Sequence, residues 1–322
     1  MWGDFRRLIF PWDGGRGLTG DDVVPCGAIH EIRIGSYAKD IYGGLVDFLH
    51  REGYRTHFFD YDWRADNADS ARELAEELRE FDAVTLICQS NGTYICRFLV
   101  RYLEPVAAID KVIMVGTANG GAVRILREMN RGRQYIRPFG RRMRPETLFT
   151  FRSLFQDLPA VPHGDADVFD AGNWKRYGWS VFAGKVTPDM EDWLRESLAN
   201  ARSFHDLLKS DSGRDLPPYY SIQSRGFDTL SRVVPPDEFA AEEKGDRHAT
   251  ITSQYWLAAE EQDALVEAIY VTGLHFEMIT TDETRAHILR IVSGVSASSR
   301  AAFPGRRPSR GPRTSAAGTD RR

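Results

Sequence analysis

The sequence has few cysteines, no long apolar run and no large excess of either charge, and each shortage excludes a class of protein. Three cysteines among 322 residues cannot form a disulfide framework, and their spacing is not that of a zinc site. No apolar run approaches the roughly 18–20 residues that a membrane-spanning helix requires. The 42 basic and 46 acidic residues give a net charge of −4, which argues against a general nucleic-acid-binding protein.

The N-terminal residues also lack the apolar segment of a signal peptide, because only Leu8, Ile9 and Phe10 precede Pro11. We therefore expect a cytoplasmic protein with reduced thiols and no transmembrane segment. The histidines show no metal-ligand spacing, so neither a metal nor another cofactor is expected.

The C-terminal residues 300–322 differ from the rest of the chain. They contain seven arginines and one aspartate, a charge of +6, which leaves −10 on the remainder. Such a segment buries too little apolar surface to offset its ordering entropy, so we expect a disordered tail. Non-specific contact with an anionic membrane or with nucleic acid is one interpretation of this charge, a solvated tail is the preferred one, and no specific nucleic acid is expected.

In the rest of the chain, short apolar runs alternate with amphipathic helical patterns, which is typical of a mostly parallel sheet. The predicted strands are residues 8–11, 56–61, 84–88, 111–116, 219–224 and 268–272. The predicted helices are residues 40–52, 70–80 and 93–103, and Ser70 is the expected N-cap of the second.

This alternation stops between Gly120 and Pro217, where tryptophans and arginines gather without a series of strands. An insertion of this size predicts a cap or lid over the C-terminal ends of the strands. The expected organisation is a doubly wound α/β core of residues 1–119 and 218–295, a cap of residues 120–217 and a disordered basic tail of residues 296–322.

The stretch that carries chemistry reads VTLICQSNGTYIC from Val84 to Cys96 and joins a predicted strand directly to a predicted helix. Within it, residues 88–92 form a G-x-S-x-G nucleophile elbow in which Cys88 replaces the first glycine. Small residues are needed on both sides of Ser90 because the turn is sharp. The turn exposes the Ser90 hydroxyl and places the Asn91 N–H at a helix N-terminus, where developing negative charge is stabilised.

An elbow of this kind predicts an acid and then a histidine further along the chain. Asp246 stands in a Gly-Asp turn, and His275 follows the last predicted strand. Taken singly, Asp246 reads as a turn or cap residue and His275 as a hydrogen-bonded loop histidine. Together with Ser90 they occur in the order of a catalytic triad, which favours catalysis.

Several stretches resemble lecithin:cholesterol acyltransferase-like proteins, a family that includes lysosomal phospholipases and phospholipid:diacylglycerol acyltransferases. The resemblance spans residues 8–292 and lies in Gly53-Tyr54, Asp60-Tyr61-Asp62-Trp63-Arg64, the elbow 88–92, the glycine-rich loop 116–121, the Ser-x-x-x-x-Leu-Pro segment 153–159, Gly245-Asp246 and His275.

The resemblance implies an α/β-hydrolase fold with a cap, and serine-dependent acyl transfer on lipid or other hydrophobic esters by Ser90, Asp246 and His275. It also implies oxyanion donors at the backbone of Asn91 and of Trp12, with Asp13 as the rival for the second position. Trp12 and Gln89 are the expected substrate-binding residues.

The family's motifs are changed at Cys88, Asp13 and Arg247. These changes motivate an alternative, a catalytically impaired relative that acts as a lipid-binding or scaffold protein. Elsewhere, Asp62 and Arg64 are expected to form a buried pair that fixes a loop. Aromatic residues at this density are more often core than an acyl tunnel, which applies to Trp174, Trp179 and Trp193.

Overall fold

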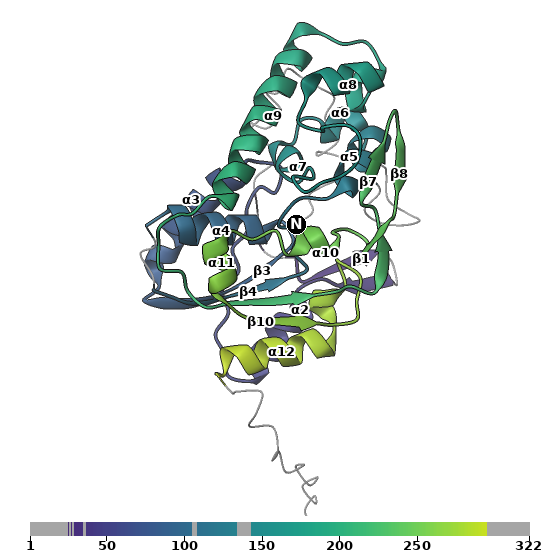
Figure 1. Ribbon diagram of the computed structural model, residues 1–322. Helices are drawn as coiled ribbons and strands as arrows, with labels where there is room; N and C mark the ends of the chain where they lie inside the picture. Colours follow the sequence, from purple (N-terminus) through teal and green to yellow (C-terminus); the bar gives the residue numbers. More distant parts are fainter. Residues whose placement is uncertain are drawn as a thin grey trace, which may run out of the picture.

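The computed structural model describes residues 25, 27, 29–34, 37–104, 108–133 and 143–294. Its centre is a four-stranded parallel sheet in the order β10-β5-β4-β3 (Figure 1). The strands are β3 (Ala83–Gln89), β4 (Ala108–Val115), β5 (Tyr219–Gln223) and β10 (Leu265–Tyr270). The predictions for residues 84–88, 111–116, 219–224 and 268–272 are therefore confirmed, although the second and last of these strands each begin three residues earlier, at Ala108 and Leu265.

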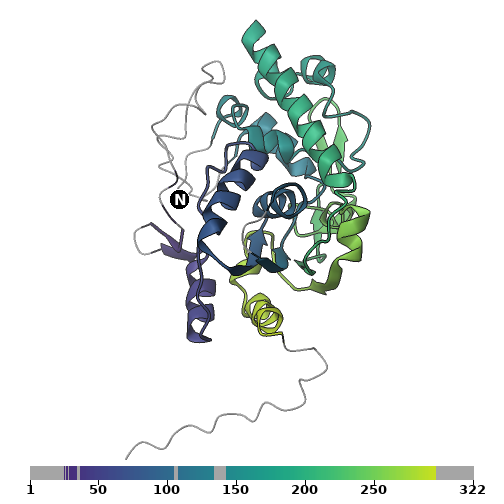
Figure 2. The ribbon, with the colours of Figure 1, turned by 90° about the vertical axis from the view of Figure 1, so that its left-hand side faces the viewer.

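Helices cover both faces of this sheet (Figures 1 and 2). On one face, α2 (Gly43–Arg51) and α12 (Asp282–Val292) pack their apolar side chains against Ile113 and Ile222. On the other face, α3 (Asn67–Glu77), η2 (Leu78–Glu80) and α4 (Gly92–Tyr102) share a core with the remaining strand side chains. The crossovers between neighbouring parallel strands thus bury the sheet on both sides, as the sequence alternation requires.

The segment between β4 and β5 is helical and lies above the sheet in Figure 1. Its elements are α5 (Val123–Arg131), α6 (Pro145–Leu148), α7 (Arg152–Gln156), α8 (Ala171–Tyr177), η3 (Ser180–Ala183) and α9 (Pro188–Lys209). These helices share a hydrophobic cluster that is separate from the two sheet clusters. Trp174 and Trp179 lie inside it at 0% and 1% exposure, and Trp193 packs against it, which agrees with the core assignment for these tryptophans.

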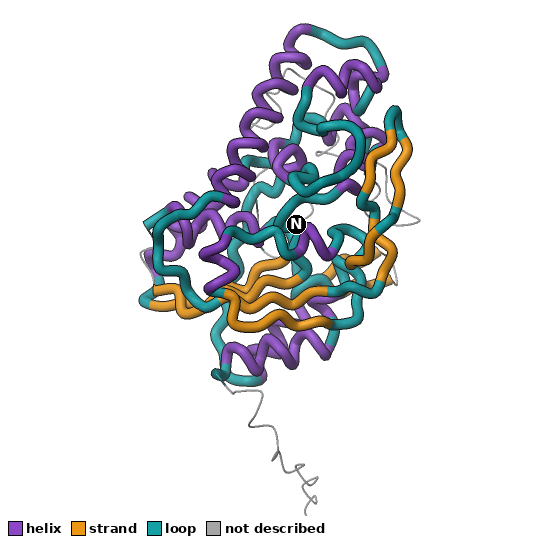
Figure 3. Tube along the Cα trace, in the orientation of Figure 1, coloured by secondary structure: helices purple, strands orange, loops and turns teal. Residues whose placement is uncertain are grey.

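The remaining elements are short. Two antiparallel pairs, β6 with β9 and β7 with β8, project beside the helices of the inserted segment (Figure 3). Their bounds, followed by those of the other short elements, are β6 (Phe227–Thr229), β7 (Arg232–Val234), β8 (Glu238–Ala240), β9 (Glu243–Gly245), β1 (Glu31–Ile34), β2 (Tyr37–Asp40), α10 (Ile251–Gln254), α11 (Ala259–Asp263) and η4 (Met278–Thr280).

Two local predictions are wrong. Residues 56–61 do not form a strand, because within the described residues no neighbouring strand pairs with their backbone. The second helix is capped by Asp66 and not by Ser70, because the Asp66 carboxylate accepts the Ala68 N–H at 2.8 Å. The predicted strand 8–11 and the basic tail lie outside the described residues.

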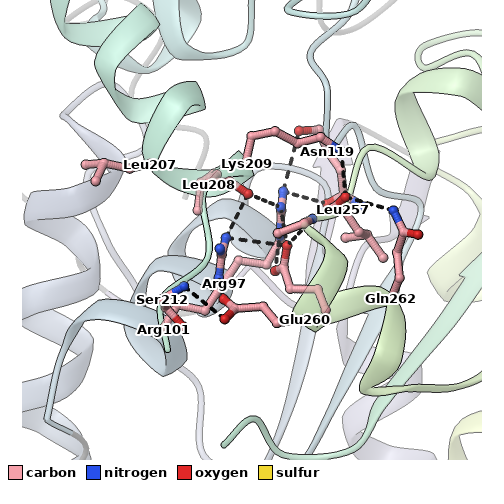
Figure 4. A network of polar contacts seen from close by, with 12 residues as sticks. Arg97, Arg101, Asn119, Leu207, Leu208, Lys209, Ser212, Leu257, Glu260 and Gln262 are labelled. Carbon is pink, nitrogen blue, oxygen red and sulfur yellow. Dashed lines mark hydrogen bonds and ion pairs between the residues drawn. The ribbon is translucent and has the colours of Figure 1, made fainter. Parts of the chain in front are cut away.

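A buried ionic network fastens α9 to the core (Figure 4). Arg97 of α4 forms a bidentate pair with Glu261 of α11, with N···O distances of 2.6 and 2.7 Å, and all of these side chains are fully buried. Arg101 pairs with Glu260 at 2.7 Å. Both arginines also donate to the Leu208 carbonyl at the end of α9, at 3.1 and 2.7 Å, which satisfies a carbonyl that the helix itself cannot.

The loop after residue 61 is held by the expected pair. Arg64, 2% exposed, donates from Nε and Nη2 to the two carboxylate oxygens of Asp62 at 2.8 and 2.7 Å. Within the described part of the chain, no helix combines the length and the apolar character needed to cross a membrane.

Candidate active site

Ser90 occupies the turn between β3 and α4. Its φ is +52°, a left-handed conformation that costs a non-glycine residue about 1–3 kcal/mol and therefore needs support from its surroundings. The support includes hydrogen bonds on both sides, because the Ser90 N–H donates to the Val115 carbonyl of β4 at 3.2 Å and the Thr93 N–H donates back to the Ser90 carbonyl at 2.9 Å. The strand-to-helix turn of the nucleophile elbow is therefore present at the predicted residue.

The structure explains how cysteine fits the first position of the elbow. Even a Cβ added at Gly92 would lie 3.8 Å from the Cβ of Cys88, an ordinary contact, so residues 88 and 92 do not crowd one another across the turn. The Cys88 Sγ turns into the core and donates to the Ile113 carbonyl at 3.6 Å. The adjacent Cys96 thiol and burial raise the pKa of the Cys88 thiol well above its ordinary value, so this cysteine stays protonated and is not a rival nucleophile.

The three residues predicted to act together lie in one hydrogen-bonded series. The Ser90 Oγ is 2.7 Å from His275 Nε2, and His275 Nδ1 is 2.8 Å from Asp246 Oδ2. His275 and Asp246 are 2% and 0% exposed. Such a series allows the imidazole to take a proton from the hydroxyl while the carboxylate fixes its orientation.

The loop that carries His275 is held by backbone contacts after β10. The His275 N–H donates to the Asp246 carbonyl at 3.1 Å, and the side-chain Nε2 of Gln89 donates to the His275 carbonyl at 3.3 Å. Gly116, at φ +55°, lies directly beneath. A Cβ there would come within 2.6 Å of Met278 Cε and 3.4 Å of the His275 carbonyl oxygen. Gln89 thus supports the loop, and its role in substrate binding stays a prediction.

Asp246 is held from the opposite side. Its Oδ1 accepts the N–H groups of His248 and Ala249 at 2.9 and 2.8 Å, which leaves Oδ2 for His275. The intervening Arg247 has a φ of +71°, a conformation that favours glycine, and its N–H donates to Thr229 Oγ1 at 3.0 Å. An arginine at this position therefore strains the turn without opening it.

Comparisons with known proteins support only the architecture. No family model and no curated protein matches the sequence. Over 89% of its length the chain matches 77% of a chain in the crystal structure of the Tle4–Tli4 complex, with 13% identity and a TM-score of 0.53. The chain has an α/β-hydrolase fold.

More distant structures include the NocB thioesterase domain in covalent complex with a fluorophosphonate nocardicin G analogue and a carboxylesterase structure from Nitrososphaera gargenis. Their identities are 12% and 14% and their TM-scores 0.34 and 0.33, with 79% of this chain and 88% and 85% of theirs covered. At these scores the likeness carries no argument about activity.

In this α/β-hydrolase fold, the predicted oxyanion donor Asn91 lies at the N-terminus of α4. Asn91 is the N-cap of this 11-residue helix, and its backbone N–H has no hydrogen-bond acceptor among the described residues. The helix dipole adds a favourable potential for an anion at this point. The second predicted donor, Trp12, and its rival Asp13 lie outside the described residues.

Residues that the sequence analysis did not single out also surround the triad. The His248 ring stacks on the His275 ring with centroids 4.2 Å apart. The side-chain amide of Asn91 donates to Asn67 Oδ1 at 2.7 Å, and Asn67 in turn donates its backbone N–H to Gln156 Oε1 at 2.9 Å. Of these residues, only His248 stands next to a predicted site residue in the sequence, two positions after Asp246.

Asp157, at the end of α7, is a further carboxyl near the elbow helix. Burial raises its pKa to about 7, and the proximity of Glu128 adds to this while Arg133 opposes it. Among the described residues, no group of three or more His, Cys, Asp or Glu side chains is arranged to hold a metal ion.

Proposed function

We propose that this protein is a serine hydrolase or acyltransferase that acts on lipid or other hydrophobic esters. The observation that carries the proposal is the continuous series of short hydrogen bonds from Ser90 through His275 to Asp246. It begins at a serine held in a left-handed turn between a parallel strand and a helix. These features together are those of an activated nucleophile with its base and orienting acid.

In the proposed reaction, Ser90 Oγ attacks the ester carbonyl carbon while His275 Nε2 takes the hydroxyl proton. The tetrahedral intermediate collapses as His275 returns that proton to the leaving alcohol, which leaves an ester between the acyl group and Ser90. Water or an acceptor alcohol then attacks the acyl carbon while His275 takes its proton. The second tetrahedral intermediate releases the acid or the new ester as its bond to Ser90 Oγ breaks and His275 returns the proton to Oγ. Asp246 keeps the imidazole in the required tautomer and stabilises the imidazolium.

The oxyanion formed in each half of the reaction is assigned to the Asn91 N–H, with the Trp12 N–H as the second donor. One well-placed donor contributes about 10²–10³-fold to the rate in serine hydrolases. Because the Asn91 side chain is tied to Asn67, the direction of its backbone N–H is restrained before substrate binds.

A lipid-like substrate is proposed from the inserted helices and from the resemblance to lecithin:cholesterol acyltransferase-like proteins. Residues 120–217 are assigned as a cap above the C-terminal ends of the strands, on the same side as the triad. Two of the stretches that carry the resemblance touch one another, because Ser153 Oγ donates to the Trp63 carbonyl at 2.6 Å and the Ser153 N–H donates to the Arg64 carbonyl at 3.3 Å. This contact joins helix α7 of the inserted segment to the loop after residue 61.

The test is turnover of p-nitrophenyl esters of increasing acyl length and of phospholipid vesicles, with Ser90→Ala as the matched control. We expect turnover of the parent protein only, with a preference for longer acyl chains. Addition of a long-chain alcohol then separates hydrolysis from acyl transfer by the appearance of a new ester. A folded parent protein that turns over none of these esters would favour the alternative, a lipid-binding or scaffold role.

A further inference from the structure

A second histidine lies against the base of the proposed triad. His248 is 4% exposed, and its ring stacks on that of His275 with a centroid separation of 4.2 Å and an interplanar angle of 28°. Phe276 presents its ring edgewise to both, at 4.8 Å from His275 and 5.9 Å from His248. Because the rings of His248 and Phe276 both pack against it, the His275 ring has little freedom to rotate away from its hydrogen bonds with Ser90 and Asp246.

The hydrogen bonds of His248 indicate which part of the residue acts. Its backbone N–H holds Asp246 Oδ1 at 2.9 Å, a contact that any residue at this position provides. The ring Nδ1 is buried and has no hydrogen-bond partner within the described residues. Burying an unpaired ring nitrogen is unfavourable, so the ring is kept for its planar face and not for a hydrogen bond at this nitrogen.

Charged and titratable groups face His248 from several elements. His275 and Asp246 lie on one side, while Arg124 of α5 and Arg133 just beyond it approach from another and both pair with Glu128, at 2.8 and 3.2 Å. Burial first, and then His275 and the two arginines, hold the pKa of His248 well below its ordinary value. The ring is therefore neutral near neutral pH and presents a π face to its neighbour.

We propose that His248 is a positioning residue for the reaction proposed above. Its neutral ring keeps the His275 ring in the orientation that makes hydrogen bonds with both Ser90 and Asp246. It also stabilises the imidazolium that forms on His275 during acyl transfer. A cation over an aromatic face is attracted by the ring electrons, and the attraction is greatest where water is excluded. The inference rests on the proposed function, because it requires that His275 take up a proton.

The test compares His248→Phe with His248→Leu in the full-length protein. Phenylalanine keeps a flat π face and leucine fills a similar volume without one. The measured quantity is the rate of labelling by a fluorophosphonate probe across the pH range, with thermal melting to confirm that each variant folds. This rate needs no knowledge of the natural substrate, and its decline at acid pH reports protonation of the base.

We expect His248→Leu to lower the plateau rate about 2- to 30-fold, the range that a lost cation–π contact gives. The acid limb of its pH profile, where the labelling rate declines, should move about half a pH unit or more to lower pH, because the protonated base has lost a stabilising contact. His248→Phe should stay within about threefold of the parent, with its acid limb unmoved. A merely structural role lowers the plateau in both variants and moves neither acid limb.

The outcomes separate the two proposals. A parent protein that is not labelled at Ser90 would overturn the proposed function and the role of His248 with it. If the parent protein is labelled and His248→Leu has the same labelling rate and pH profile, the role of His248 alone is overturned. A folded His248→Phe that is labelled as slowly as His248→Leu would overturn it too. If His248→Leu does not fold, His248→Gln, which is polar and also lacks a ring, replaces it in the same comparison.

Discussion

The two ends of helix α4 use buried polar groups in opposite ways. At its N-terminus, Ser90, His275 and Asp246 come from three separate loops, and the chain at Ser90 is held in a left-handed conformation. Along its middle and end, Arg97 and Arg101 meet two glutamates of α11 and a carbonyl of α9 in relaxed helices. The first arrangement places strain where chemistry is proposed, and the second holds the frame against which that strain is maintained.

The ionic network is costly to form and more costly to break. Two charges removed from water lose several kcal/mol each of solvation, which a bidentate pair only about recovers. Loss of one partner leaves the other charge buried and unpaired. We therefore expect substitutions in the triad to lower activity with little change in stability. Substitutions in the ionic network should lower stability without acting directly on the chemistry.

The largest effect is expected at the nucleophile. Ser90→Ala should reduce ester turnover by about 10⁴- to 10⁶-fold, because the hydroxyl that forms the acyl-enzyme is gone. The unfolding free energy should change by less than about 1 kcal/mol, since alanine keeps the Cβ and the backbone hydrogen bonds of the turn. Turnover rates and urea unfolding measure the two quantities. A large loss of stability in this variant would break the comparison.

The next effect is expected in the network. Arg97→Met should lower the free energy of unfolding by about 3–5 kcal/mol, because Glu261 stays buried without its bidentate partner. The matched control is Arg72→Met, which removes an exposed pair with Asp69 at 57% and 68% side-chain exposure and should cost less than about 1 kcal/mol. Urea unfolding of both variants checks this, and equal costs would contradict the account.

Acid should weaken the α9 side of the molecule through His205. Burial lowers the pKa of this histidine to about 4 in the folded protein, below its ordinary value of 6.5, so the unfolded chain takes up the proton first as the pH falls. The contribution of His205 to the free energy of unfolding is thus fully present above about pH 6.5 and decreases by about 3 kcal/mol by pH 4.

His205→Phe should remove most of that decrease while keeping the edge-to-face contact with Tyr94. Part of the slope should remain, because burial also lowers the pKa of His248. Unfolding measured at several pH values between 4 and 7 checks this, and a slope that is unchanged in the variant would refute the assignment.

The smallest effect is expected beneath the triad. Gly116→Ala should cost about 1–2 kcal/mol, because alanine resists the left-handed φ of +55° and its Cβ meets Met278. The same Cβ approaches the His275 carbonyl, so we expect turnover to fall about tenfold through displacement of the base. A variant that loses stability but keeps full turnover would show that Gly116 serves the fold alone.

The difference between the two ends of α4 also explains what the sequence could predict. The elbow is a local pattern of strand, small residues and helix, so Ser90 and the strands around it are readable from neighbouring residues. Arg97 and Glu261 are 164 residues apart and belong to no motif, so their pairing requires the tertiary structure.

Other misses have similar physical causes. The strands β6 to β9 have three residues each, too few to show an alternating pattern. Residues 56–61 have strand-like composition, yet a strand also needs a partner that composition cannot specify. Asp66 and Ser70 are both common helix caps, and the contact of Asp66 with Asn200 of α9 accompanies the earlier start.

Fluorophosphonate labelling of the intact protein, with the modified residue mapped by mass spectrometry, tests directly whether Ser90 is an activated nucleophile. We expect one adduct, on Ser90, which disappears in Ser90→Ala and in His275→Ala while both variants remain folded. A folded parent that acquires no adduct, or one labelled on another serine with Ser90 unmodified, would contradict this expectation.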